Sequence, residues 1–552
     1  MEPASLTTAY SDYEMIAIHD AESRLGVTLD PRPEGKTIER IDFLRLPPVD
    51  RHDPLPAAIN AAHTTTKEYV VRRSLFVKEG DRFKKAIVDE SARSLRSLRQ
   101  LSLVVCAPVT GSHDDTVRLV VITKDVWSLY VDFDLALTSG GLESLTLEPK
   151  ETNIAGIHHA ASGHFVLEPK TVTAGASYEI PRLDGRWLSL STEANAIVNR
   201  DSGELEGGNV ATRVQRPLFS SRTEWAWSVS SSVSNQIRRR YVNAQVATFS
   251  NPVTGEATPW QWRERLADED ANVTRSFGWA AKNDFTLGAR FSHARYDAAD
   301  PELRRAAVPT GEDRAGPYVQ WHGYRSDFLR TFDLAGLALQ EDHRLGYDVT
   351  VRAYPSLRAF GSTRDVIGGS IKAAYGVPLG DGIARASVES TVESDTTRIS
   401  DGWVKGSFGV ATPRFGPGPL KGRFVFAASA LDRFANYLNA QSFLGGDSLL
   451  RGYPSRALVG RDLVTANIEY RTRSFDLVAI QVGAVGFFDA GDAFDRWSDL
   501  DPKQSAGGGL RIVFPQIDRA VLRLDLGVPI HRAPDVDPFS FFVAFHQALE
   551  LP

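Results

Sequence analysis

The sequence predicts two structural units, a small α+β domain followed by an all-β antiparallel barrel that spans a membrane. Helical and strand patterns occur together only between residues 36 and 125. From about residue 145 to the C-terminus, alternating strands follow one another, separated by Gly, Pro, Asp and Asn turns. The 408 residues after residue 144 supply about 16 strands, at roughly 25 residues for each strand with its share of the loops.

Within the α+β domain, the expected order of elements is strand, helix, helix, strand, strand. The two helices carry apolar residues near helical spacing, and the strands alternate or are apolar throughout. These elements cover residues 38–44, 64–76, 84–98, 101–107 and 117–123. The chain is then divided into a polar N-terminal segment, the α+β domain, a linker and the barrel, at residues 1–35, 36–125, 126–144 and 145–552.

The composition argues against nucleic acid as a partner and leaves a membrane barrel open. The net charge is −6, and positive and negative residues are interspersed, so no basic stripe is available for phosphates. No apolar run approaches the roughly 18–20 residues of a transmembrane helix. A membrane barrel places its lipid-facing residues at alternate positions, so an ordinary hydrophobic content of 42% suits it as well.

The single cysteine and the first residues of the sequence provide information on cysteine chemistry and on whether the protein is exported. Cys106 cannot form an intramolecular disulfide or a multi-cysteine metal site, and its apolar surroundings indicate a small core residue. The start, Met1 to Ser5, lacks the basic and apolar regions of a signal peptide. We expect an exported protein whose signal peptide has been removed from this sequence, because a membrane barrel requires export.

Two alternating strands follow the tripeptide Arg451-Gly452-Tyr453 near the end of the chain. In the first, residues 464–471, Glu469 lies on the polar face, and Val464, Ala466, Ile468 and Tyr470 form the apolar face. In the second, residues 479–491, Asp489 lies on the polar face. One loop arginine and two strand carboxylates can therefore meet on the polar side of a sheet, as a buried ion cluster inside the barrel.

These motifs resemble the BamA/TamA-like outer-membrane β-barrel superfamily (the bacterial surface antigen barrel) with a single POTRA domain. The segments that resemble a POTRA domain are residues 66–73, 79–81, 91–96 and 123–127. Those that resemble early barrel strands are residues 152–156, 178–181 and 213–219. The late-barrel signature consists of Leu450-Arg-Gly-Tyr453, Asn467-Ile-Glu-Tyr470 and Gly486-Phe-Phe-Asp-Ala-Gly491, which includes Phe488. Together they span nearly everything after residue 36.

The resemblance implies a role for each residue of the loop motif. In this family the Arg-Gly-Tyr lies at the tip of a loop that folds into the barrel lumen. Mapped here, Arg451 contacts Asp489 and Glu469, because a planar guanidinium engages two carboxylates in fixed geometry. Gly452 lets the backbone bend or approach closely, and Tyr453 wedges against the wall. The alternative is an ordinary surface loop whose arginine points to water.

The resemblance also implies a weak seam where the first and last strands of the barrel meet. An open strand edge offers unpaired backbone groups to a client strand. The last strand is expected at residues 539–549, with Phe541, Val543 and Phe545 on the lipid side. Leu549 takes the position where the family usually has an aromatic residue.

The function that follows from the resemblance is outer-membrane protein assembly or translocation. The POTRA domain, in the periplasm, captures an extended polypeptide, and the barrel inserts it into the membrane or passes it across. The expected partners are the lipid bilayer, extended client polypeptides and accessory assembly subunits. No cofactor is implied, because folding of the client in the membrane supplies the driving force. The alternatives are a two-partner-type secretion pore for one dedicated substrate, and a passive channel or structural barrel.

Enzymatic chemistry and metal binding are not expected. His158 and His164 share a strand face but lie roughly 20 Å apart, so they cannot hold one ion. The glycine-rich runs at residues 445–446 and 508–509 do not join a strand to a phosphate-binding helix. No Gly-x-Ser-x-Gly elbow of a serine hydrolase occurs, and no pair of carboxylates lies in an identifiable cleft.

Overall fold

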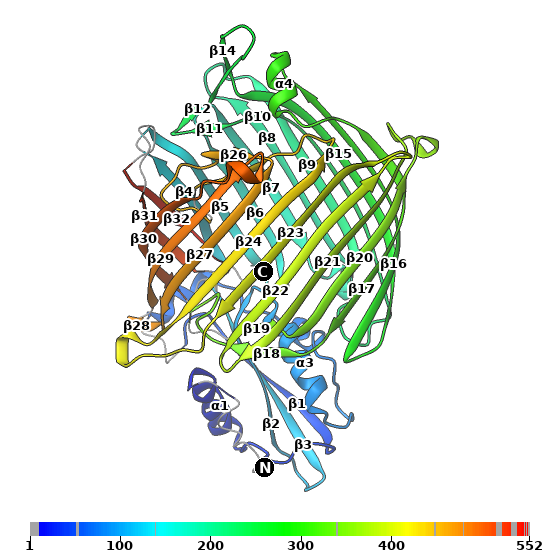
Figure 1. Cartoon of the computed structure of the whole chain (residues 1–552). Helices are drawn as coiled ribbons and strands as arrows, with labels where there is room; N and C mark the ends of the chain where they lie inside the picture. The colour runs from blue at the N-terminus through cyan, green and yellow to red at the C-terminus, as the bar shows by residue number, and fades with distance from the viewer. Residues whose placement is uncertain are drawn as a thin grey trace.

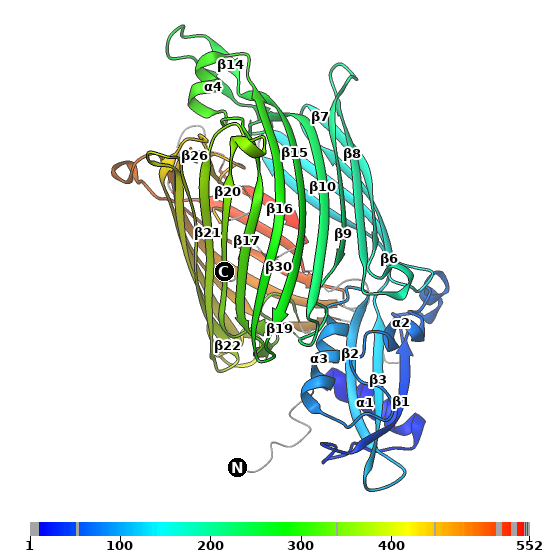
Figure 2. The ribbon, with the colours of Figure 1, turned by 90° about the vertical axis from the view of Figure 1, so that its right-hand side faces the viewer.

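The computed structural model shows a small N-terminal unit beneath one end of a large barrel (Figures 1 and 2). The residues that it describes are 10, 12–50, 55–138, 140–337, 341–446, 449–477, 480–514, 521–530, 538–545, 547 and 549. Among them, no helix is both long enough and apolar enough to cross a membrane.

The N-terminal unit is a three-stranded sheet with helices on both faces. Its strands are β1 (Thr37–Leu46), β2 (Leu101–Thr110) and β3 (Thr116–Asp125), in the order β1-β3-β2, with β1 parallel to β3 and β2 antiparallel to it. The helices are α1 (Asp12–Leu25), η2 (Ala57–Ala62), α2 (Glu68–Arg72) and α3 (Lys85–Arg96). Residues of α2 and α3 pack on one face of the sheet, and residues of α1 on the other.

Two features of this unit differ from the sequence expectation. The segment predicted as a polar tail contains α1, whose Ala17, Ile18 and Ala21 are buried against β2 and β3. This apolar stripe is narrow, so the sequence pattern was too weak to predict a helix here. The helix expected over residues 64–76 is only five residues long, because the preceding residues are extended and bind Asp125. Identification of the unit as a POTRA domain rests on the resemblance and stays a prediction.

The described strands close into a barrel of twenty strands, so the expected 16 is wrong. The wall consists of β4 (Leu129–Thr138), β5 (Gly141–Ile154), β6 (His159–Leu167), β7 (Thr171–Ile180), β8 (Ser189–Asn199), β9 (Leu205–Arg216), β10 (Trp225–Arg239), β15 (Gln261–Phe277), β16 (Ala281–Asp297), β17 (Asp313–Arg325), β20 (Gly346–Ser356), β21 (Val366–Leu379), β22 (Gly382–Ser394), β23 (Ile399–Ala411), β24 (Gly422–Asn436), β27 (Asp462–Thr472) continued by β28 (Phe475–Leu477), β29 (Ile480–Phe494), β30 (Lys503–Val513), β31 (Leu522–Pro529) and β32 (Ser540–Ala544).

The strand count was underestimated for two physical reasons. Many strands are joined by tight turns, such as the two residues between β21 and β22, so each strand uses less chain than assumed. The wall also begins earlier than expected, because β4 lies within the predicted linker and β5 begins there.

The smaller elements lie in the loops. They are the hairpins β11 (Tyr241–Val242) with β12 (Gln245–Val246), β13 (Thr248–Ser250) with β14 (Ala257–Pro259), β18 (Phe328–Thr331) with β19 (Glu341–Arg344), and β25 (Ser442–Leu444) with β26 (Leu458–Gly460). The helical turns are η3 (Leu183–Gly185), α4 (Pro301–Ala307), η4 (Arg358–Phe360), η5 (Gly418–Leu420) and η6 (Trp497–Asp499). Helix α4 and β14 lie at the end of the barrel away from the N-terminal unit, and β18 and β19 lie at the near end (Figure 1).

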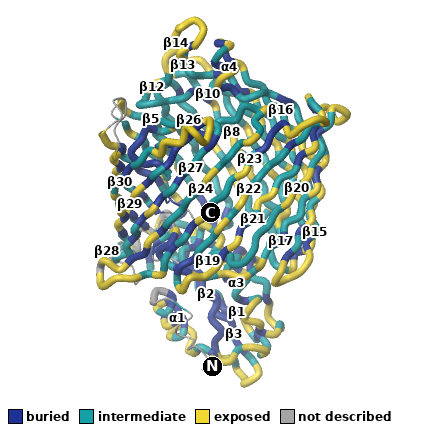
Figure 3. The backbone as a smooth tube through the Cα atoms, in the orientation of Figure 1, coloured by how far each residue is buried: buried dark blue, intermediate teal, exposed yellow. Residues whose placement is uncertain are grey.

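The wall strands have one apolar outer face and one polar inner face. Burial alternates along the strands, whereas β2 and β3 of the N-terminal unit are almost continuously buried (Figure 3). Leu287, Val319 and Val351 face outward and are exposed. This alternation is typical of a barrel whose outside contacts lipid and whose lumen holds water and polar side chains.

Candidate functional site

Arg451 is buried inside the barrel, where it binds two carboxylates of the wall. Its Nε and Nη2 donate to the two carboxylate oxygens of Asp489, each at 2.9 Å, and its backbone N–H donates to the same group at 3.0 Å. Its Nη1 donates to Glu469 at 2.6 Å. The side chain of Arg451 is 1% exposed, and both carboxylates are fully buried. The structure thus brings together the three residues that the sequence placed on one face.

The cluster is larger than the sequence analysis expected. Asp525 of β31 also accepts from Arg451 Nη1, at 3.2 Å, and Arg511 and Arg523 flank it. Arg471 donates to Glu469 at 2.7 Å. We call these seven residues the arginine cluster: Arg451, Arg471, Arg511, Arg523, Glu469, Asp489 and Asp525. The sequence does contain a pattern that could have identified three of them. Arg511, Arg523 and Asp525 alternate with outward-facing residues along β30 and β31, which places them on the inner face.

The wall beneath the cluster is built from glycines and one aromatic ring. The guanidinium carbon of Arg451 lies 3.5 Å from the centre of the Phe487 ring, a cation–π contact. A Cβ on Gly509 would lie 2.0 Å from an Asp525 oxygen, and one on Gly507 would lie 2.4 Å from Phe487. The glycines at residues 507 and 509 therefore leave room for the cluster against the wall.

The other residues of the loop motif fix its backbone and its contact with the wall. Gly452 has a φ of +105°, and a Cβ there would lie 3.0 Å from the Ser505 Cβ. Leu450 and Tyr453 are buried in an apolar group with Leu444. The Tyr453 hydroxyl donates to the Gln504 carbonyl at 3.4 Å. The loop is thus held by apolar packing as well as by charge.

Gly452→Ala should destabilise the folded barrel by about 1–2 kcal/mol, because the left-handed backbone is costly for alanine and the wall leaves no space. The measurement is the urea dependence of the shift in gel mobility between folded and unfolded barrel. Gly486→Ala is the matched control, because Gly486 faces outward with no atom within 4 Å of its Cβ position. Equal midpoints for the two variants would contradict the strain at Gly452.

The three residues of the predicted strand motif lie on different faces of β29. Gly486 and Phe488 face outward, and Phe488 is exposed. Gly491 faces inward, where a Cβ would lie 2.8 Å from Leu444 and from the Val464 carbonyl. Gly491 therefore supports the packing of the loop, whereas Phe488 belongs to the lipid-facing surface.

The predicted seam residues divide into two groups. Phe541 and Val543 pair with Leu137 and Leu135 on the outward face of β4, and the Phe545 ring packs edge-on against Phe133 at 5.1 Å. The last strand, however, ends at Ala544 instead of residue 549.

Leu549 does not occupy a lipid-facing strand position, which corrects the expectation. It is buried in an apolar group with Leu334, Ile383, Ala411 and Val425, and Val425 faces the lumen beside Glu469. Two arginines of the cluster contact this end of the chain: Arg471 Nη2 donates to the Leu549 carbonyl at 2.6 Å, and Arg511 Nε donates to the Gln547 side chain at 2.9 Å.

The segment between β17 and β20 links the arginine cluster to the N-terminal unit. Arg471 Nη1 donates to the carbonyl of Leu334, which is buried in the lumen. On the same segment, Asp342 of β19 accepts from Arg96 of α3 at 3.1 Å, and Arg93 lies over the Phe328 ring. The β18–β19 hairpin with its connecting loop thus contacts both the N-terminal unit and the arginine cluster.

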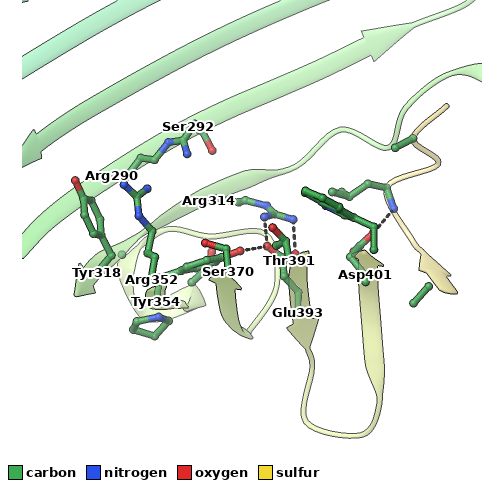
Figure 4. A pocket seen from close by; sticks show the side chains of 18 of the residues that line it. Arg290, Ser292, Arg314, Tyr318, Arg352, Tyr354, Ser370, Thr391, Glu393 and Asp401 are labelled. Atoms are coloured by element: carbon green, nitrogen blue, oxygen red, sulfur yellow. Dashed lines mark hydrogen bonds and ion pairs between the residues drawn. The ribbon is translucent and has the colours of Figure 1, made fainter. Parts of the chain in front are cut away.

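A second polar region lies in the lumen, in a cavity of about 490 Å³ between β16 and β24 (Figure 4). Arg314 pairs with Glu393, and Tyr354 also donates to Glu393. Arg290 and Arg352 project into the same space. The cavity combines charged, hydroxyl and aromatic side chains, so it can contact a polar chain that passes through the lumen.

A buried polar network joins the N-terminal unit to the first hairpin of the barrel. Asp125 accepts from the Thr66 backbone at 2.7 Å, the Thr66 hydroxyl at 3.0 Å and Asn153 at 3.4 Å. His63 Nε2 lies 2.9 Å from the same oxygen, and His158 contacts the Thr66 hydroxyl. The network explains why residues 64–67 are extended. The histidines that the sequence analysis rejected as metal ligands lie in two places. His158 belongs to this junction, whereas His159 contacts Tyr178 and His164 contacts Glu148 in the barrel wall.

One segment of the chain matches a known protein superfamily. Residues 433–545 match the Omp85 superfamily domain. A Treponema pallidum (strain Nichols) protein described as a "Putative outer membrane protein assembly factor" is 23% identical over 264 residues, which are 43% of this chain and 30% of that protein. The chain therefore spans about a third of the length of that relative.

Solved structures that match this chain include the Haemophilus ducreyi BamA that lacks POTRA domains 1–3, with a TM-score of 0.36 at 12% identity, covering 98% of this chain and 94% of that one. CdiB from Escherichia coli gives 0.47 at 12% identity, covering 98% and 85%. CdiB from Acinetobacter baumannii gives 0.45 at 10% identity, covering 98% and 82%. All seven residues of the arginine cluster lie within residues 433–545, and this segment of the chain matches the Omp85 superfamily domain.

Proposed function

We propose that this protein assembles polypeptides into, or moves them across, the outer membrane, using the seam between β32 and β4. The N-terminal unit lies in the periplasm and captures an extended segment, which then pairs with a strand edge at the seam. The observation that carries the proposal is the shortness of the seam.

Among the described residues, β32 pairs with β4 over three residue pairs only. On the other side, β32 pairs with β31 over five, whereas β10 and β15 pair over fifteen. Each ladder pair contributes backbone hydrogen bonds that must break before the wall opens. Opening between β32 and β4 therefore breaks fewer of the described ladder pairs than opening between β31 and β32 or between β10 and β15, and it exposes two edges to which a client strand can add.

The N-terminal unit offers an edge of its own. Strand β2 is one of the two edge strands of the sheet, and on its outer side the described chain pairs only near Val109, through Leu29. An extended segment can add there by backbone hydrogen bonds without sequence preference. This edge supports the capture step of the proposal.

A disulfide across the seam tests the proposal. Leu135→Cys with Val543→Cys places two thiols directly opposite, at a Cα separation of about 4.5–5.5 Å, which a disulfide can bridge. In proteoliposomes, oxidation should stop insertion of a client barrel, and reductant should restore it. Native Cys106 does not interfere, because burial raises the pKa of its thiol to about 12.

The matched control is Val233→Cys with Ala267→Cys, an outward pair between β10 and β15. Its oxidation should leave insertion unchanged. Normal insertion with the seam oxidised would refute the proposal. Transport across the membrane that persists while insertion stops would instead identify a secretion pore.

A further inference from the structure

A pocket of about 330 Å³ lies at the junction between the N-terminal unit and the barrel. Arg73 at the end of α2 and Arg182 in the turn between β7 and β8 both line it, beside Ser74 and His158. Arg182 Nη2 donates to the Ser74 hydroxyl at 3.0 Å, and its guanidinium lies 3.5 Å from the Trp187 ring centre. The backbone at Gly185 lies directly against the guanidinium of Arg73, since a Cβ at this position would lie 2.0 Å from Arg73 Nη1.

The charge of this pocket is unbalanced. Neither Arg73 nor Arg182 forms an ion pair with any carboxylate that the structure describes, and Asp184, which also lines the pocket, pairs with neither. Burial and the neighbouring Arg73 lower the pKa of Arg182 to about 10. Burial and Arg182 lower the pKa of His158 to about 4. Two positive guanidinium groups therefore repel each other beside the neutral His158, where an anion would be favoured.

The position of the pocket indicates the source of that anion. The turns that line it form the rim of the barrel next to α2 (Figure 2). Just above, Tyr178 and Ile180 share the outward, lipid-facing side of β7. Trp187 stacks on Phe219 at 4.3 Å, and Trp225 is exposed nearby on the outer face. Aromatic residues mark the level of lipid headgroups in membrane barrels.

We propose that this junction pocket binds the phosphate of a phospholipid headgroup from the leaflet that faces the N-terminal unit. Arg73 and Arg182 donate to the phosphate oxygens, and Tyr69, Leu98 and Ile157 contact the neighbouring apolar atoms. The lipid would then contribute to docking of the N-terminal unit against the barrel. This proposal is independent of client handling.

The test is native mass spectrometry of the full chain in detergent, with added phosphatidylethanolamine, diacylglycerol or inorganic phosphate. The wild type should bind one phosphatidylethanolamine tightly, and diacylglycerol should not compete. Each of Arg73→Gln and Arg182→Gln should weaken binding about tenfold, because each removes a charge-assisted hydrogen bond. Arg186→Gln, an exposed arginine of the same turn that does not line the pocket, should bind as the wild type does.

Unchanged lipid binding by the Arg73→Gln, Arg182→Gln double variant would overturn the proposal, provided that its gel mobility shows a folded barrel. Inorganic phosphate that displaces the lipid at equal concentration would also overturn it, because the site would then hold free phosphate. Equal losses in the double variant and in Arg186→Gln would reduce the effect to general surface charge and overturn the assigned site.

Discussion

Arg451→Ala is expected to destabilise the barrel by about 3–5 kcal/mol, as removal of one partner from a buried ion cluster does elsewhere. Asp489 loses two hydrogen bonds at once, those from Nε and Nη2, and keeps the one from the backbone N–H of residue 451. Glu469 keeps Arg471, and Asp525 keeps Arg511. The cost therefore falls mainly on Asp489, a fully buried carboxylate that keeps Asn467 as a neutral donor.

Urea unfolding followed by gel mobility measures this loss. Arg451→Lys keeps the charge without the planar fork, so its loss should be intermediate. Arg265→Ala is the control, because its ion pair with Asp297 is exposed and contributes only about 0–1 kcal/mol. An Arg451→Ala midpoint equal to that of Arg265→Ala would show that the cluster does not hold the wall.

The geometry also predicts the result of a charge exchange. Arg451→Asp combined with Asp489→Arg should recover little stability, although the two residues touch. The new carboxylate would face Glu469 and Asp525, which lie 2.6 and 3.2 Å from Arg451 Nη1 in the native structure.

Asp125→Ala is expected to release the N-terminal unit from the barrel, at a cost of about 3 kcal/mol in docking free energy. Within the N-terminal unit, the substitution removes the acceptor of the Thr66 N–H and the partner of His63, so the segment that Asn153 and His158 of the barrel contact loses its anchor. Asn153 also loses its own contact with Asp125. Because about 1.4 kcal/mol is a tenfold change, the released state should become about 100-fold more populated.

Hydrogen exchange at residues 64–67 and protease cleavage between β3 and β4 measure this release. Both should rise in Asp125→Ala, while the gel mobility of the folded barrel stays unchanged. Asp114→Ala, at an exposed position of the β2–β3 turn, should behave as the wild type does. Unchanged exchange in Asp125→Ala would mean that other contacts, such as Arg96 with Asp342, hold the unit in place.

Alternation along single strands predicted much of the candidate site. The period of two placed Glu469 and Asp489 on the inner face, and the motif placed Arg451 next to them. The same rule applies to Arg511, Arg523 and Asp525, but their strands carry no loop motif that draws attention to them. The number of barrel strands was predicted less well, because it depends on the lengths of the turns, which vary along the chain.

Other features depend on contacts between segments that lie far apart in the chain. Leu549 reads as the end of a strand, yet it packs in the lumen, where Arg471 binds its carbonyl. The helix α1 reads as a polar tail, yet the sheet buries its narrow apolar stripe. Asp125 and His63 lie far apart in the sequence and meet within the N-terminal unit, and Asn153 joins them only where this unit contacts the barrel.

The sequence by itself determined the class of the protein: an α+β unit before a barrel whose polar inner face carries Arg451 and its first two partners. These properties follow from local periodicity and from one motif, both of which can be recognised in the sequence without the three-dimensional structure. Only the tertiary structure decided the twenty strands, the inward path of the chain after β32, the short seam and the junction between domain and barrel. Each depends on which distant segments meet, because register, closure and burial are set by the whole wall.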